Sequence, residues 1–391
     1  MSQFQRPRAP DAQRVAIVID LEHAYKWHQE LFAGVYDHAR KRGWQVEPMA
    51  FSQEVVARSA TAQRPYDGII GRVDRRLSTF ARAKGIPLVN VWHSSPVREV
   101  TRVVPDCVRV GTIAAEHLLS RGFRRFAFVG LRGVRASQEQ ESGFREVIRS
   151  HGLPYETFWT PMFMDRGWEN HARRTRALVA WLNRVARPIG VFTAQDILAR
   201  HLINVTAAAG VGVPAEMGIV GAYNEEVVCM SCEPTVTSID LGCYRIGTAA
   251  ARMLEHMMAG GPAPTEPVRI KPIGLVARAS TDVFASDDPL VARALRYISD
   301  NCHRPINVAD VARAVKTCGR TLVRHFKRDR GCRVIDELTR MRVTRGTRLL
   351  AEGNDPIRTV ARECGFAGRN SFVVAFRRVT GITPTEFRRQ R

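Results

Sequence analysis

The feature that most constrains this chain is a change of hydrophobic pattern near residue 280. Up to that point, short apolar runs of strand length alternate with longer stretches of helical periodicity, beginning with Val-Ala-Ile-Val-Ile at 15–19. Strands that alternate with helices in this way predict parallel sheets joined by crossover helices. From residue 290 the pattern is helical to the end. We therefore expect an α/β region followed by an all-α region.

The α/β region contains two series of strand-like runs, one after the other. They lie at 15–19, 68–71 and 87–91, and then at 125–130, 189–193 and 218–221. Two such series predict two lobes with a cleft between them. The expected organisation is a disordered tail at 1–13, a two-lobed α/β domain at 14–280, a linker at 281–289 and a helical domain at 290–391.

The chain is strongly basic, with a formal net charge of +21. Residues 287–391 hold 23 Lys and Arg against 11 Asp and Glu, which is a net of +12, so the preceding residues carry the other +9. A basic domain points to phosphate, either in nucleic acid or on an anionic lipid surface. Charge alone leaves a solvated basic surface as the alternative.

Two helix pairs in the basic region have the pattern of helix-turn-helix units. The first pair is expected at 308–315 and 320–327, with Asn307 as the cap of its opening helix. Leu322 and Phe326 lie four residues apart and face inward. The side chains that this leaves facing outward, as candidate DNA contacts, are Arg320, Thr321, Arg324 and Lys327.

The second pair is expected at 357–363 and 369–378. Gly365 supplies the positive φ that a tight turn between two helices tends to need. Phe372 and Phe376 repeat the inward pair of the first unit. The side chains that this leaves facing outward are Arg369, Asn370, Val373 and Arg377, of which the two arginines and the asparagine are candidate DNA contacts.

The segment that joins the two pairs predicts a helix at 334–350, followed by a capped helix start. Pro356 is expected in the first turn of the next helix, with Asp355 or Asn354 as its cap. The joining helix carries Arg340, Arg342, Arg345 and Arg348. Two reading helices on a rigid rod, about one DNA turn apart, can enter successive segments of the major groove.

The helical region resembles the DNA-binding domain of AraC-type transcription regulators. The resemblance rests on VARECGF at 360–366 and on GITPTEFR at 381–388, while 308–327 resembles the family's other helix-turn-helix. It implies sequence-specific DNA binding, in which Arg binds guanine and Asn binds adenine. Val373 and Val374 stand where the family often has a small polar residue and an Arg, and these departures bear on the operator sequence.

The α/β region resembles the periplasmic-binding-protein-like ligand domains of LacI/GalR-type repressors. The segments that carry this resemblance are 109–130, 192–196 and 211–224. It implies a ligand-sensing domain whose cleft holds a small effector. Joined to AraC-type helices, it implies an activator of carbohydrate-use genes that is gated by a sugar such as xylose. The alternative is a DNA-binding regulator whose sensor binds a non-sugar ligand or none.

The candidate effector contacts follow from that resemblance, and they are Asp196, Gln140, Tyr223, Asn224, Trp92 and Trp168, with His93 and Glu22 as further residues of the first lobe. Gln140 stands where such sensors usually place an Arg, and Tyr223 where they often place an acidic residue. Asp196 remains as a carboxylate, while Trp92 and Trp168 offer flat faces for a sugar ring. Because a charged hydrogen bond is about twice as strong as a neutral one, the two departures leave the effector open. A place in the core or on the surface is the other interpretation of each residue.

Other classes of protein lack their motifs in this sequence. We find no G-x-S-x-G elbow, no Walker A loop and no H-E-x-x-H, so no enzyme is expected. Cys229-Met-Ser-Cys232 is the one C-x-x-C spacing among eight cysteines, and no second pair completes a metal site. We therefore expect no metal and no cofactor. A binding module with degenerate DNA contacts and a DNA-binding enzyme are the alternatives from other classes.

The remaining expectations concern location and partners. No apolar run reaches the roughly 18 residues of a membrane span, and the first residues lack the apolar core of a secretion signal. We therefore expect a cytoplasmic protein without a membrane partner. The expected partners are a double-stranded DNA operator, a small effector, a second copy of the chain and RNA polymerase.

Overall fold

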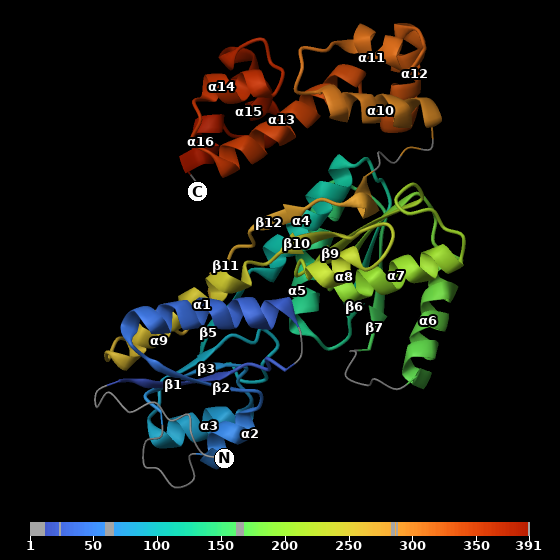
Figure 1. Cartoon of the computed structure of the whole chain (residues 1–391). Helices are drawn as coiled ribbons and strands as arrows, with labels where there is room; N and C mark the ends of the chain where they lie inside the picture. Colours follow the sequence, from blue (N-terminus) through green and yellow to red (C-terminus); the bar gives the residue numbers. More distant parts are fainter. Residues whose placement is uncertain are drawn as a thin grey trace. The chain divides into compact units, whose positions relative to one another are not determined.

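The structure is a computed structural model that describes residues 12–22, 25–58, 66–161, 168–282, 286 and 288–389 (Figure 1). The chain forms two compact units, residues 1–118 with 124–282 and residues 119–123 with 283–391. Most of the predicted tail lies outside the described residues. Within the part of the chain that is described, no helix is long and apolar enough to cross a membrane.

The first unit contains two six-stranded sheets, one in each lobe. The sheet of lobe 1 has the order β11-β5-β4-β3-β1-β2, and every neighbouring pair in it is parallel. Its strands are β1 (Arg14–Val18), β2 (Gln45–Met49), β3 (Gly68–Gly71), β4 (Leu88–Asn90), β5 (Thr101–Pro105) and β11 (Val268–Ile270). The predicted parallel sheet is therefore confirmed in lobe 1.

The sheet of lobe 2 has the order β12-β10-β9-β8-β6-β7. Its strands are parallel except for β12, an edge strand that runs antiparallel to β10. They are β6 (Phe126–Leu131), β7 (Tyr155–Thr160), β8 (Ile189–Thr193), β9 (Met217–Ala222), β10 (Thr237–Asp240) and β12 (Gly274–Val276). Buried apolar side chains of this sheet and its helices form one core cluster, and a separate cluster fills lobe 1.

Helices cover both sheets, as the crossover pattern predicted. In lobe 1, α1 (Lys26–Arg42) and α9 (Cys243–Met258) lie side by side (Figure 1). A Cβ on Gly34 or on Gly247 would collide with the backbone of the other helix, so this close approach requires glycine. The remaining helices of this unit are α2 (Ser52–Arg58), α3 (Arg75–Lys84), α4 (Cys107–Ser120), α5 (Arg135–Ser150), α6 (Trp168–Leu182), α7 (Asp196–Ala208), α8 (Glu226–Met230) and the 3₁₀ turn η1 (Ala279–Thr281).

The second unit is helical throughout its described residues. Its helices are α10 (Pro289–Asn301), α11 (Val308–Ala314), α12 (Gly319–Arg330), α13 (Val334–Glu352), α14 (Ile357–Glu363), α15 (Arg369–Thr380) and α16 (Pro384–Arg389). One apolar cluster joins α10, α11, α12 and the start of α13, and a second joins the end of α13 to α14, α15 and α16. Each helix-turn-helix unit therefore has its own small core, and α13 belongs to both.

The helix starts of this unit test the predicted caps. Asn307 caps α11 as predicted, in a full capping box with Asp310. The α10 helix also has a side-chain cap, Asp288, with Pro289 in its first turn. For α14 the predicted bounds are confirmed, but the predicted place of Pro356 inside its first turn was wrong. Pro356 is extended and precedes the helix, and no side chain caps it, so neither Asn354 nor Asp355 acts as the cap.

Candidate DNA-reading helices and effector site

The first helix-turn-helix unit presents a row of cations on α12. Leu322 and Phe326 are fully buried, so the opposite face of the helix is turned to solvent. Arg320, Arg324 and Lys327 are exposed on that face and make no ion pair within the described residues. Unpaired cations at this spacing are free to bind phosphate or base edges.

The flanks of α12 are tied down inside the unit. Asp288 accepts from Arg328 Nη2 at 2.9 Å and from the amide of Leu290 at 3.0 Å, and it lies 2.6 Å from His325 Nδ1. Burial would raise the pKa of Asp288, but the contacts with His325, Leu290 and Arg328 outweigh it and lower that pKa. Thr321 Oγ1 lies 3.1 Å from Cys318 Sγ at the start of the helix. The helix is thus anchored at its sides while its outward row stays unpaired.

The second unit presents a different row on α15. Phe372 and Phe376 are fully buried, so this helix is oriented as α12 is. Arg369, Asn370 and Arg377 are exposed. Apart from Thr321, which is half-buried, the predicted DNA candidates of both helices are therefore exposed, and their contact with DNA stays a prediction. The other outward prediction, Val373, is half-buried.

The arginines of α13 take a role that sequence reasoning missed. Arg342 donates to the carbonyls of Cys302 at 2.9 Å, Arg304 at 2.7 Å and Ile306 at 3.1 Å. Its guanidinium also lies 5.7 Å from the ring centre of Phe366, in the turn of the second unit. Arg342 therefore joins the segment after α10 to the second helix-turn-helix, and no local periodicity signals this.

The turn of the second unit is shaped to meet that same segment. Gly365 has a φ of 75°, as predicted. A Cβ at Gly365 would collide with the carbonyls of Cys302 and Arg304. Arg345 adds a bond of 3.1 Å to the carbonyl of Glu363.

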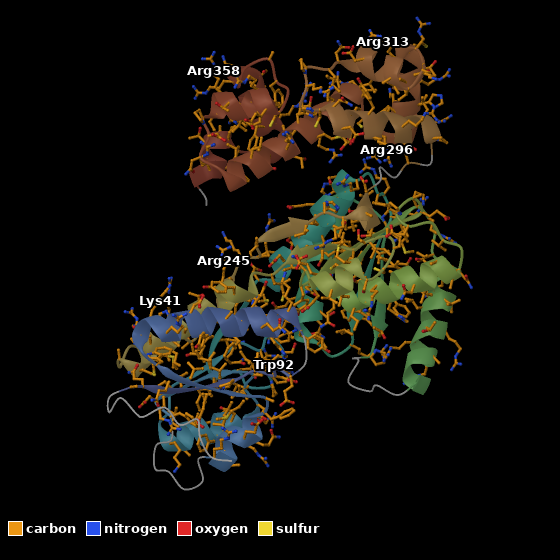
Figure 2. All side chains as sticks on the ribbon, in the orientation of Figure 1. Lys41, Trp92, Arg245, Arg296, Arg313 and Arg358 are labelled. Carbon is orange, nitrogen blue, oxygen red and sulfur yellow. The ribbon has the colours of Figure 1, made fainter. Side chains whose placement is uncertain are left out.

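In Figure 2, by contrast, Arg313 of α11 and Arg358 of α14 project outward from the helical unit.

In the first unit, a pocket of about 480 Å³ lies between the two lobes. It is lined by the segment after β4 and by α5 with the residues around it, namely Ser94, Ser95, Pro96, Arg98, Val108, Gly133, Arg135, Gln138, Glu139 and Ser142. Most of these side chains are polar, and the size is that of a small-molecule site. None of the five predicted effector contacts whose side chains the structure describes lines this pocket.

Glu139 is the centre of a charged cluster at the edge of the pocket. Its carboxylate lies 2.7 Å from Arg269 Nη1 and 3.0 Å from His93 Nε2, both on lobe 1, and 3.0 Å from Arg135 Nε on its own helix. Burial alone would raise the pKa of Glu139, but these three partners hold it well below its usual range.

A second bridge between the lobes involves Glu225. Its carboxylate accepts from the backbone amides of Lys26 at 2.8 Å and Trp27 at 3.2 Å, the first amides of α1. These amides lack a side-chain cap from their own segment, so a carboxylate of lobe 2 caps a helix of lobe 1. Lys26 Nζ adds a bond of 3.1 Å to the carbonyl of Asn224. Glu139 and Glu225 together connect the lobes at two places.

Asp196 lies inside lobe 2, with 1% of its surface exposed. Its two oxygens accept from Ser238 Oγ at 2.5 Å and from the amide of Glu225 at 2.8 Å. Burial raises the pKa of Asp196 to about 7, against the opposing effect of these bonds. Both oxygens are therefore bound by the protein itself. Contact between Asp196 and an effector stays a prediction.

Tyr223 and Asn224 follow β9 beside Asp196. Both have positive φ, 95° and 51°, which is uncommon for residues with side chains. Asn224 is held by Ser238, Asp240 and Arg278, whose Nη2 lies 2.7 Å from Asn224 Oδ1. Strained backbone of this kind is stored where the surroundings fix it, and such places are often functional.

Gln140 differs from these residues because its carboxamide has no partner. It is 1% exposed on α5, and neither its oxygen nor its nitrogen makes a hydrogen bond among the described residues. A buried unpaired amide is costly. The structure brings Asp196, Tyr223 and Asn224 together, while Gln140 stands on a separate helix of the same lobe.

The remaining candidates belong to lobe 1 or lie outside the described side chains. Trp92, labelled in Figure 2, is half-buried after β4, and Arg72 stacks 4.8 Å from its ring centre. Glu22 is exposed. Trp168 begins α6, but its side chain lies outside the described residues. Arg72 is a cation that sequence reasoning missed, although its place directly after the apolar strand β3 was a usable signal.

Known proteins share both units of this chain. Residues 115–281 match the family model of a periplasmic binding protein-like domain, and residues 311–390 match that of a helix-turn-helix domain. The xylose operon regulatory protein of Haemophilus influenzae is 27% identical over 290 residues, which cover 73% of this chain and 74% of that protein. Its counterpart in Escherichia coli K12 is 26% identical over 333 residues, covering 82% of this chain and 83% of that protein.

A solved structure agrees with this at the level of the fold. The structure of the xylose-binding transcription activator xylR matches with a TM-score of 0.60 at 23% identity. The match covers 97% of this chain and 99% of that one. It supports the order of a two-sheet α/β domain followed by a helical domain.

Proposed function

Because this chain is a DNA-binding transcription regulator that joins a periplasmic binding protein-like domain to an AraC-type helix-turn-helix domain, homologous to xylose operon regulatory proteins, we propose that a sugar bound between its lobes gates its binding to DNA. The observation that carries the DNA half of this proposal is the pair of exposed, unpaired polar rows on α12 and α15. The names of the relatives support the sugar half.

The two helices enter successive segments of the major groove in this proposal. The side chains assigned to DNA are Arg320, Thr321, Arg324 and Lys327 on α12, with Arg369, Asn370 and Arg377 on α15. Arg320 and Arg324 read base edges in one segment, and Arg369 and Asn370 in the next. The other cations bind phosphate and set the register. Arg342 supports this geometry because it holds the two helix-turn-helix units together.

Gating uses the contacts between the lobes. A sugar in the pocket beside Glu139 competes with that carboxylate for Arg135 and so weakens the ion pair between them. The contact of Glu225 with the first amides of α1 stays in place. The polar lining suits hydroxyl groups, which donate and accept hydrogen bonds. The result is a change in how the lobes close and, through a homodimer, in how the DNA-reading helices meet adjacent half-sites. In this proposal the protein works in the cytoplasm and activates transcription through contact with RNA polymerase.

The second candidate is a regulator whose sensor binds a different small molecule or none. Gln140 favours it, because a neutral, unpaired amide stands where related sensors carry an Arg. The pocket lining favours it too, since it contains none of the five residues with described side chains that are predicted to contact a sugar. Both candidates share the same DNA-binding mechanism, so the effector is the point on which they differ.

The test is a thermal-shift panel of monosaccharides, including D-xylose, on the full chain. A ligand at 100 times its Kd adds about 2.7 kcal/mol to the stability of the domain that binds it. Arg135→Ala should abolish the shift, because Arg135 lines the pocket. The matched control is Arg109→Ala, whose exposed side chain pairs with Glu116 on α4 and is not among the residues that line the pocket. A shift in both variants would move the site elsewhere, and no shift with any sugar would favour the second candidate.

A further inference from the structure

The two DNA-reading helices carry outward rows of the same spacing but of different chemistry. The buried pairs Leu322 with Phe326 and Phe372 with Phe376 set the two helices in one register. In that register, positions i, i+4 and i+7 of the exposed face hold Arg320, Arg324 and Lys327 on α12. The same positions on α15 hold Asn370, Val374 and Arg377.

The central residue of the row is therefore a cation in one helix and an apolar side chain in the other. Val374 is 69% exposed, with Asn370 one turn before it and Arg377 one turn after it. Single exposed apolar residues are common on proteins, so exposure alone carries nothing. Its place does, because the side chain at the centre of this face is the one presented most directly to a bound groove.

The major groove offers one apolar group to such a side chain. Only thymine displays a methyl group there, and Val is of the right size to cover it. Asn370, on the same face, has the donor and acceptor geometry that pairs bidentately with adenine. An apolar side chain next to an amide therefore suits a site with adenine and thymine in adjacent positions.

We propose that Val374 contacts the methyl group of a thymine, so that α15 reads an A·T-containing half of the operator through Asn370 and Val374. The corresponding position on α12, Arg324, reads guanine. This inference rests on the proposed DNA-reading role of the two helices and deepens it. The two halves of the binding site then differ in composition, which fixes the direction in which one chain lies on its operator.

The experiment starts from a duplex selected by the full-length protein out of a random-sequence pool. Each thymine of the selected site is then replaced singly by uracil, which removes only the C5 methyl group. We expect the replacement at one or two positions to lower the protein's affinity for the duplex by about three- to fivefold, which is the loss expected for one apolar group. Elsewhere in the site the replacement should change affinity little.

Variants assign that methyl contact to a residue. Val374→Ser should bind the thymine and uracil duplexes equally, because its side chain no longer covers the methyl group. The matched control is Val379→Ser on the same helix, since Val379 is 43% exposed but lies on the side of Phe372 and Ala375. It should keep the difference between thymine and uracil. Val374→Arg should shift the preference at that position toward guanine, as in the α12 half.

The outcomes separate this inference from the proposal beneath it. A selected site that shows no thymine-to-uracil effect, or one that Val374→Ser leaves unchanged, overturns the inference and keeps the DNA-binding role. Failure to select any site, together with binding that ignores salt, overturns the DNA-reading role itself and the inference with it.

Discussion

The sensor domain and the helical domain handle charge in opposite ways. In the sensor, the half-buried carboxylate of Glu139 is surrounded by His93, Arg135 and Arg269. On the reading helices, Arg320 and Arg324 are exposed and unpaired within the described residues. The paired groups stabilise the fold and the contacts between the lobes. The exposed arginines are available to bind a charged partner such as DNA. Exposed cations without an ion-pair partner among the described residues therefore indicate a surface that binds DNA.

Arg342 is the clearest exception, because it is a cation of the helical domain that behaves like those of the sensor. Arg342→Met should destabilise the helical unit by about 3 kcal/mol, since three carbonyls lose their donor. Specific DNA binding should fall by more than 100-fold, because the two reading helices lose their common support. Circular dichroism melting and duplex titration measure both effects.

The control for Arg342 is Arg313→Ala, which removes an exposed guanidinium from α11 whose one pair is with Asp310. It should change stability by less than about 0.5 kcal/mol. If Arg342→Met changed stability as little as this control, the structural role of the buried contacts of Arg342 would be contradicted.

The reading helices predict the converse behaviour, with binding lost and stability kept. Arg324→Ala should weaken specific binding by about 10- to 100-fold, which corresponds to roughly 1–3 kcal/mol for one bidentate base contact. Binding to unrelated duplexes should fall much less. Fluorescence anisotropy on a selected and a scrambled duplex checks this, and equal loss on both would make Arg324 a phosphate contact. Arg369→Ala tests the same point on α15.

The sensor's buried charge predicts an effect of pH. Because burial raises the pKa of Asp196 to about 7, the folded state binds its proton more tightly than the unfolded state. That contribution is fully present below the ordinary carboxyl pKa and is lost as pH rises through about 7. Asp196→Asn should therefore remove a decline of stability between about pH 4 and pH 7, at roughly 1.4 kcal/mol per pH unit. Denaturant melts across that range measure it, and parallel curves for both proteins would contradict the assignment.

The sequence predicted those features that local pattern determines. The alternation of strands and helices, the Asn307 cap and the positive φ at Gly365 depend on neighbouring residues, and the structure confirms each of them. The exposed row on α12 follows from the same kind of argument. A local error was the place of Pro356, which precedes α14 in an extended conformation and is not part of its first turn.

The features that sequence reasoning missed all join residues far apart in the chain. Glu225 caps α1 by binding the amide of Lys26, which lies 199 positions earlier in the chain. Glu139 binds Arg269, which belongs to the other lobe. Arg342 is an ordinary member of a basic helix until the carbonyls after α10 are placed beside it. The effector site suffers most from this, because its lining comes from two lobes, whereas a reading helix carries its function on one face.

One titration tests the central claim directly, namely the affinity of the full chain for its selected duplex across a salt series, with and without each sugar of the panel. For a regulator whose cations contact several phosphates, the logarithm of affinity should fall against the logarithm of salt concentration with a slope steeper than about −3. One sugar should also change the affinity for the selected duplex and leave the scrambled one unchanged. Binding that is flat with salt, or that no sugar alters, would contradict a sugar-gated DNA-binding regulator.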